Sequence, residues 1–66
     1  MKGWNNNYVK PKKTNCFYDI EIVIDNKSRI IRNLQYSERF NFFYDEGTNE
    51  QFGRFEILNW KESKPT

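Results

Sequence analysis

The chain has 66 residues and a mass of 8.1 kDa, which allows one domain and excludes a large core, because folding at this size buries only about 60% of the unfolded surface. Its net charge of +2 is too small to indicate a polyanionic partner. The absence of histidine removes the commonest general base, the commonest metal ligand and any Ser-His or Cys-His nucleophile pair.

The residue types favour sheet over helix. No alanine occurs, whereas β-branched and aromatic residues are plentiful. We therefore predict a mainly β fold, a small antiparallel sheet of about four strands. The alternative is an α+β fold with a short helix at about 37–46. The predicted organisation is a basic, partly flexible arm over 1–15, a single small β domain over 16–60 and a frayed tail over 61–66.

The clearest predicted strand is YDIEIVID, residues 18–25, in which apolar and polar residues alternate with the period of two of a half-buried strand. A three-residue loop, Asn26 to Ser28, would pair Ile24 with Ile30 and Ile20 with Leu34 in a hairpin. This register sets Val23 opposite Ile31 on the second face, beside Phe17. That apolar face must be covered or must be a contact surface.

The segment RFNFFY, residues 39–44, is rich in aromatic rings. As a strand it would turn Phe40, Phe42 and Tyr44 inward and leave Phe43 exposed. As a helix begun at Ser37, it would bury Phe43 and expose Phe42 instead. We favour the strand because of the aromatic density. A hairpin tip at 45–50 and a last strand over 52–60, with Phe55 and Ile57 inward, complete the domain.

No arrangement of residues predicts catalysis, a cofactor or a metal. Asp19 and Glu21 share one strand face, but we interpret them as part of a solvated face balanced by Arg29 and Arg32. The lone Cys16 cannot form an internal disulfide and is interpreted as an ordinary thiol. Because the chain shows neither a signal peptide nor an apolar span, we expect a cytoplasmic protein without membrane contact.

The overall frame resembles a family of short phage and prophage domains of unknown function. The matching features are Trp4, Pro11, the strand YDIEIVI, Tyr36, and the closing ILNWKESKP with Trp60 and Pro65. The sequence departs from this frame by lacking a second proline close after Trp60. The resemblance implies a mobile-element origin and no known activity.

We therefore expect a small non-enzymatic protein-binding module, encoded by a phage or mobile element. It would act as an inhibitor or adaptor of a host protein, for example a defence nuclease such as a CRISPR effector. A homodimer through the apolar second face is a further possibility. The candidate partner-binding residues are aromatic or apolar side chains among polar neighbours: Phe43, Val23, Ile31, Phe17, Trp4 and Trp60.

The alternative is a single-stranded nucleic-acid-binding protein. Rings and cations alternate in the N-terminal arm, and exposed rings stack on unpaired bases. The residues for this function are Trp4, Tyr8, Lys10, Lys12 and Lys13.

Overall fold

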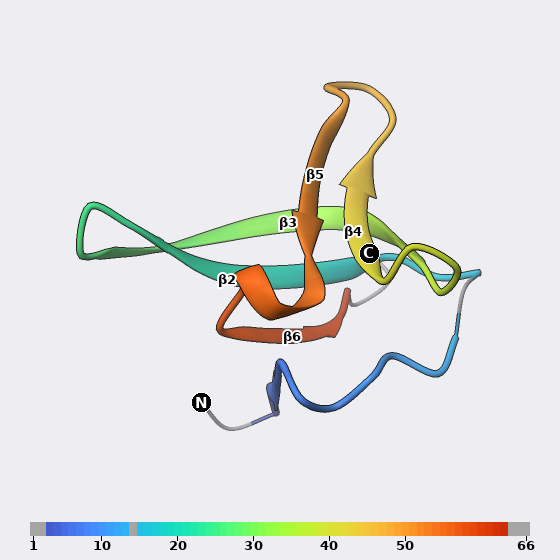
Figure 1. The fold of residues 1–66 in the computed structure, drawn as a ribbon, viewed down its shortest axis with the longest axis horizontal. Helices are drawn as coiled ribbons and strands as arrows, with labels where there is room; N and C mark the ends of the chain where they lie inside the picture. Colours follow the sequence, from blue (N-terminus) through green and yellow to red (C-terminus); the bar gives the residue numbers. More distant parts are fainter. Residues whose placement is uncertain (1–2, 14, 64–66) are drawn as a thin grey trace.

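The chain forms one antiparallel sheet of six strands in the order β1-β6-β2-β3-β4-β5 in the computed structural model, which describes residues 3–13 and 15–63 (Figure 1). The elements are β1 (Asn5–Asn6), β2 (Tyr18–Ile24), β3 (Lys27–Ser37), β4 (Phe42–Asp45), β5 (Glu50–Gly53), the 3-10 turn η1 (Arg54–Glu56) and β6 (Asn59–Glu62). The predicted mainly β, antiparallel fold is confirmed, with six strands where about four were expected. The helix alternative at 37–46 is wrong.

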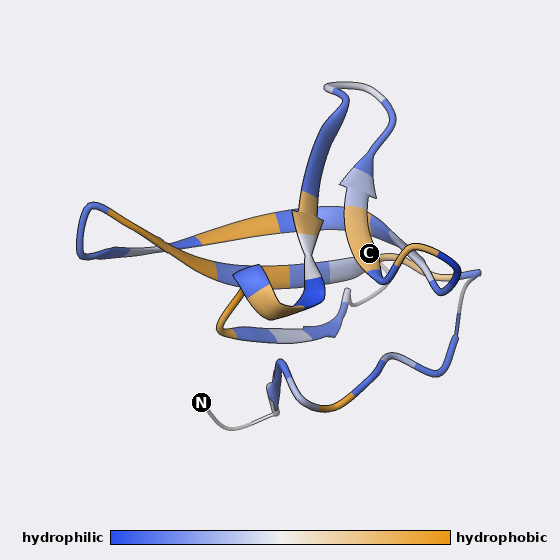
Figure 2. Ribbon diagram, in the orientation of Figure 1, coloured by the Kyte–Doolittle hydropathy of each residue, from blue (hydrophilic) through white to orange (hydrophobic). Residues whose placement is uncertain are grey.

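The long strand β3 joins the two parts of the sheet. Its first part pairs with β2 and its last residues pair with β4, so that the β4–β5 hairpin stands across the β2–β3 ribbon (Figure 1). Hydrophobic residues follow β2, β3 and the lower part of β4, whereas the end of the β4–β5 hairpin is hydrophilic (Figure 2). The core lies between these two parts and consists of Tyr18, Ile20, Ile22, Leu34, Tyr36, Phe43, Ile57 and Trp60.

The β2–β3 turn differs from the predicted one. Ile24 pairs with Lys27 across a two-residue turn, and Ile20 pairs with Ile31. The predicted loop at Asn26 to Ser28 is therefore wrong. The turn residues Asp25 and Asn26 have φ of 52° and 64°. Asp and Asn tolerate this left-handed conformation better than other non-glycine residues, and two such residues make the type I′ turn that suits a twisted hairpin.

A β-bulge on β3 after Ile31 turns the even-numbered residues Leu34 and Tyr36 towards the core. Tyr18 pairs with Leu34 while Ile20 pairs with Ile31, so Arg32 and Asn33 together oppose Asp19. Asn33 takes a φ of 62° at this irregularity. The extra residue shifts the alternation by one, which allows Ile31 and Leu34 to face the same side although they are three residues apart. Both Leu34 and Tyr36 are thereby buried.

Strand β4 presents the face opposite to the one predicted. Phe43 is fully buried, with 0% of its surface exposed, whereas Phe40 is 63% exposed and Phe42 and Tyr44 are half-buried. The register explains this result, because Phe43 lies between Tyr36 on β3 and Phe52 on β5. Tyr36 already faces the core, and directly paired residues of neighbouring strands point to the same side.

The predicted last strand is interrupted. Residues 52–60 run through β5, η1 and β6, and the break at η1 leaves Phe55 61% exposed, which corrects its predicted inward position. Ile57 is buried as predicted. At the C-terminal end, β6 continues to Glu62, and Ser63 donates a backbone hydrogen bond to the carbonyl of Phe17. The rest of the predicted tail, and with it Pro65, lies outside the described residues.

Candidate interaction surface on strand β4

Three aromatic rings form a row on the outer face of the β3–β4–β5 part of the sheet. We call Phe40, Phe42 and Tyr44 the aromatic ladder. The rings of Phe40 and Phe42 stack with their centroids 5.7 Å apart and their planes at 20°. Phe42 meets Tyr44 edge to face, also at 5.7 Å. The alternation of β4 places Phe42 and Tyr44 on one side, because Phe43 between them points into the core, and the turn before β4 sets the Phe40 ring against Phe42.

Polar side chains border the ladder. Gln35 and Gln51 lie on either side of Tyr44 in the register, and the Tyr44 hydroxyl contacts the Gln35 amide oxygen at 3.2 Å. At the other end, the Arg39 guanidinium lies 5.3 Å from the centre of the Phe40 ring. The ladder therefore combines apolar area with side-chain donors and acceptors, the composition of small binding surfaces.

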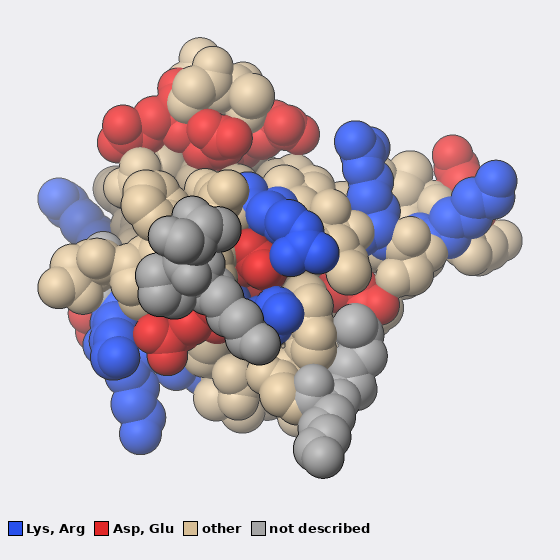
Figure 3. Space-filling model, turned by 180° about the vertical axis from the view of Figure 1, so that it is seen from behind, with Lys and Arg blue, Asp and Glu red and all other residues tan. Residues whose placement is uncertain are grey.

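The charge around the ladder is uneven. The β4–β5 hairpin carries Asp45, Glu46 and Glu50 at its end, and carboxylates gather at that end of the molecule in Figure 3. The tip is fixed locally, since the Gly47 amide donates to the Asp45 carboxylate at 2.8 Å. The hairpin tip predicted at residues 45–50 is thus present. One end of the aromatic ladder adjoins negative charge, while Arg39 lies at the other.

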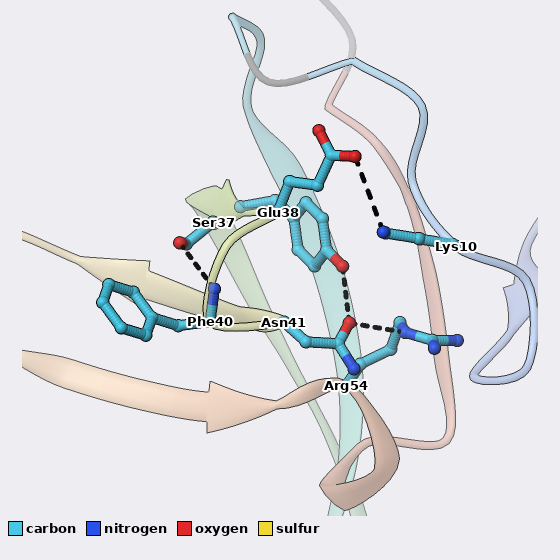
Figure 4. A network of polar contacts seen from close by, with 7 residues as sticks. Lys10, Ser37, Glu38, Phe40, Asn41 and Arg54 are labelled. Carbon is cyan, nitrogen blue, oxygen red and sulfur yellow. Dashed lines mark hydrogen bonds and ion pairs between the residues drawn. The ribbon is translucent and has the colours of Figure 1, made fainter.

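A polar network holds the turn that begins the ladder. Asn41, with a φ of 58°, accepts hydrogen bonds through Oδ1 from the Tyr36 hydroxyl at 2.6 Å and from Arg54 Nε at 2.8 Å (Figure 4). Its backbone carbonyl also accepts from the Arg54 amide. The Ser37 hydroxyl accepts from the amide of Phe40. The position of Phe40 is therefore set by bonded neighbours rather than by a free loop.

Two of the predicted partner-binding residues are unable to serve as surface anchors. Phe43 is fully buried, and Trp60 is only 6% exposed. The Trp60 indole donates to the carbonyl of Val9 at 2.7 Å, and its ring packs edge to face on Tyr18. The predicted exposure of Phe43 is wrong, and Trp60 is likewise part of the core, because so small a chain needs these rings there.

The other predicted anchors do not form one surface. Val23 and Phe17 are 49% and 53% exposed. Phe17 directly precedes β2 and Val23 lies near its other end, about 20 Å away at about 3.3 Å per strand residue. Ile31 is half-buried against the core. Val23 instead belongs to the exposed end of the β2–β3 hairpin, together with Ile24 and Ile30.

The aromatic and basic residues of the N-terminal arm are partly engaged by the rest of the fold. Trp4 is half-buried, with the Lys61 ammonium 5.0 Å from its ring. Tyr8 is 81% exposed and meets Phe55 edge to face. Lys10 pairs with Glu38 at 3.6 Å and Lys13 with Glu62 at 3.5 Å. The structure therefore does not gather Trp4, Tyr8 and the lysines into one stacking platform.

The carboxylates of Asp19 and Glu21 have structural partners. Asp19 is 3% exposed and not solvated as expected; it accepts from the Asn33 amide, the Ser63 hydroxyl and Arg32. Glu21 accepts from Ser28 and Asn59, and these hydrogen bonds lower the pKa of its carboxyl. Burial raises the pKa of the Tyr18 hydroxyl, which donates to the carbonyl of Lys13.

Sequence reasoning missed the aromatic ladder although it singled out the segment. The available signal was the polarity of the neighbouring strands. Gln35, Ser37 and Gln51 share the outer face, whereas Leu34, Tyr36 and Phe52 share the inner one. Pairing β4 with these neighbours would have turned Phe43 inward. Within residues 3–13 and 15–63, no group of three or more Cys, Asp or Glu side chains is arranged to hold a metal ion.

No family model, characterised protein or solved structure matches the chain. The resemblance to phage domains therefore stays a prediction. Among the described residues, no helix is long and apolar enough to cross a membrane.

Proposed function

We propose that this protein is a non-enzymatic protein-binding module and that the aromatic ladder is its contact surface. The observation that carries this proposal is the exposure of Phe40 and the half-exposure of Phe42 and Tyr44 on one face. A chain of this size needs its large rings for its core. Keeping three adjacent rings outside the core is understandable if a partner covers them.

The charge pattern supports a protein as the occupant of this face rather than a nucleic acid. Asp45, Glu46 and Glu50 at the hairpin end would repel phosphates that approached along the ladder. The same carboxylates would attract a partner surface that carries lysine or arginine. The mobile-element origin rests on the sequence resemblance alone, and the role as an inhibitor or adaptor of a host protein rests on the short, histidine-free chain.

The test is capture of a host protein by immobilised variants of the chain from nuclease-treated lysate. Phe40→Ala and Phe42→Ala together should abolish capture of the protein that the wild type retains. Phe55→Ala is the matched control, because Phe55 is equally exposed and its ring packs on Tyr8 rather than on a ring of the ladder. It should leave capture intact. Circular dichroism of each variant establishes that the fold is kept.

Two results would contradict the proposal. Capture that disappears with nuclease treatment would assign binding to nucleic acid, and capture that is equal for the ladder variant and wild type would move the contact elsewhere. Self-association is tested by sedimentation of the free protein. A wild-type dimer that becomes a monomer in the ladder variant would show that a second copy of the chain covers this face.

A further inference from the structure

A cleft of about 290 Å³ lies between the N-terminal arm and the sheet, on a different part of the molecule from the aromatic ladder. Its apolar lining includes Tyr18 and Trp60 from the core. Its charged lining consists of Lys10, Lys12 and Lys13 from the arm and Glu62 from β6. Segments that are about 50 residues apart in the sequence thus form its walls.

Hydrogen bonds from side chains of the sheet to the arm backbone fix the arm beside this cleft. The Trp60 indole donates to Val9, and the Tyr18 hydroxyl donates to Lys13. Arg54 donates to the carbonyl of Asn7 at 2.7 Å and fixes the start of the same segment. Tyr18 and Trp60 are buried core residues, so the accessible apolar lining comes mainly from Val9, and the charge comes from the rim.

The rim is cationic. Lys10, Lys12 and Lys13 line the cleft with the carboxylate of Glu62, and Glu38 pairs with Lys10 beside it, so three cations and two carboxylates leave a net charge of +1. Lys13 pairs with Glu62 and Lys10 with Glu38, but these contacts, at 3.5 and 3.6 Å, join exposed side chains and are weak. Lys12 forms no ion pair with any residue in the described ranges 3–13 and 15–63.

We propose that this cleft binds a phosphate monoester that carries a small organic group. Such a group has a charge of about −1.5 to −2 at neutral pH and three acceptor oxygens, which suits a cationic rim in which Lys12 has no carboxylate partner among the described residues. The volume, about 290 Å³, lies just below the range of about 300–1,000 Å³ found for small-molecule sites, which restricts the organic group to a small one. The organic group would lie against the exposed side chain of Val9 and the edge of Trp60 that borders the cleft.

The proposal predicts opposite effects for two substitutions in the cleft. Lys12→Gln removes a cation and should weaken binding about fivefold to tenfold, whereas Glu62→Gln removes the repelling carboxylate and should strengthen it. Loss of structure alone would not give changes of opposite sign. Phe40→Ala, which alters only the aromatic ladder, should leave binding unchanged, so this site is tested independently of the proposed protein contact.

The experiment is an NMR titration of the full chain with phenyl phosphate, with benzyl alcohol as the uncharged control. The Trp60 indole signal and the backbone amides of residues 9–13 should shift in a saturable way, and added salt should weaken the effect. Parallel titrations use inorganic phosphate, which tests the contribution of the organic group, and a 5′-phosphorylated oligonucleotide.

Three outcomes would overturn the proposal. The first is the absence of saturable shifts with phenyl phosphate up to millimolar concentration. The second is binding that neither Lys12→Gln nor Glu62→Gln changes. The third is binding of the oligonucleotide without binding of phenyl phosphate, which would assign the arm lysines to nucleic acid instead.

Discussion

Asp19 and Glu21 differ in environment although they lie on the same side of β2. Asp19 opposes the bulge on β3, where the Asn33 amide and Arg32 approach it, and Ser63 covers it from the end of β6. Glu21 remains half-exposed and bridges the neighbouring strands through Ser28 and Asn59. The bulge therefore converts one position of a predicted solvated face into a buried, fully bonded carboxylate.

Glu21 makes folding stability depend on pH. Its pKa in the folded chain lies below its ordinary value of 4.5 because Ser28 and Asn59 donate hydrogen bonds to the carboxylate. A lowered folded-state pKa gives a stabilising contribution that is present above the unfolded pKa and is lost as the pH falls through the folded one. From about pH 6 to about pH 3, the free energy of unfolding should therefore fall less for Glu21→Gln than for wild type.

Urea unfolding at several pH values measures this difference, and Asp25→Asn at the exposed turn serves as the control. If the free energy of unfolding changes with pH by the same amount in wild type and Glu21→Gln, these hydrogen bonds do not favour the ionised carboxylate.

At the scale of elements, β4 separates the rings of one short segment into core and surface. Phe43 packs on Tyr36 and Tyr18 with ring centroids 5.0 and 5.8 Å away, while Phe40 and Phe42 stack on the outer face. The opposite orientation of β4 would bury three rings instead of one, so the number of buried rings alone favours it. Pairing decides the matter, since β4 lies between the strands that carry Tyr36 and Phe52.

This orientation predicts very unequal costs for neighbouring substitutions. Phe43→Ala should lower the free energy of unfolding by about 3–5 kcal/mol, because it leaves a cavity in the core. Phe40→Ala should change it by no more than about 0.5 kcal/mol, as expected for an exposed site. Urea unfolding measures both. If Phe43→Ala does not fold, Phe43→Leu replaces it in the comparison with Phe40→Ala. A larger loss of stability for Phe40→Ala than for the Phe43 variant would show that Phe40, and not Phe43, is the core residue.

At the scale of the whole molecule, Arg54 joins three distant parts of the chain. Its side chain donates to Asn41 before β4 and to Asn7 after β1, while its guanidinium lies 4.4 Å from the centre of the Phe55 ring. The side chain of Asn7 in turn donates to Ile57 at 2.7 Å. These bonds hold the arm against the β4–β5 part of the sheet and connect the turn at the ladder with the cleft.

Removing this connection should loosen the arm and destabilise the fold. We expect Arg54→Ala to lower the free energy of unfolding by about 1.5–3 kcal/mol, the range for loss of hydrogen bonds to a charged group. Amide hydrogen exchange over residues 5–13 should become faster. Arg39→Ala is the matched control, because Arg39 is exposed and contacts only the Phe40 ring among the interactions described above. Equal exchange in the two variants would contradict the role of Arg54.

The sequence by itself determined the β class, the antiparallel hairpin that begins at Tyr18, and the hairpin tip at residues 45–50. These features depend on local properties: alternation with a period of two, β-branched and aromatic residue types, and turn-forming side chains. The inward positions of Tyr18, Ile20 and Ile22 follow from the same alternation, and all three are buried.

Only the tertiary structure decided the register of β2 and β3, the orientation of β4 and the route of the arm. The register depends on two left-handed turn residues and a bulge, and one shifted residue exchanges the faces of a strand. The orientation of FNFFY depends on neighbours that pairing alone brings together. For that reason the candidate surface moved from Phe43 to the three rings beside it, and the arm lysines came to line a cleft together with Glu62 of β6.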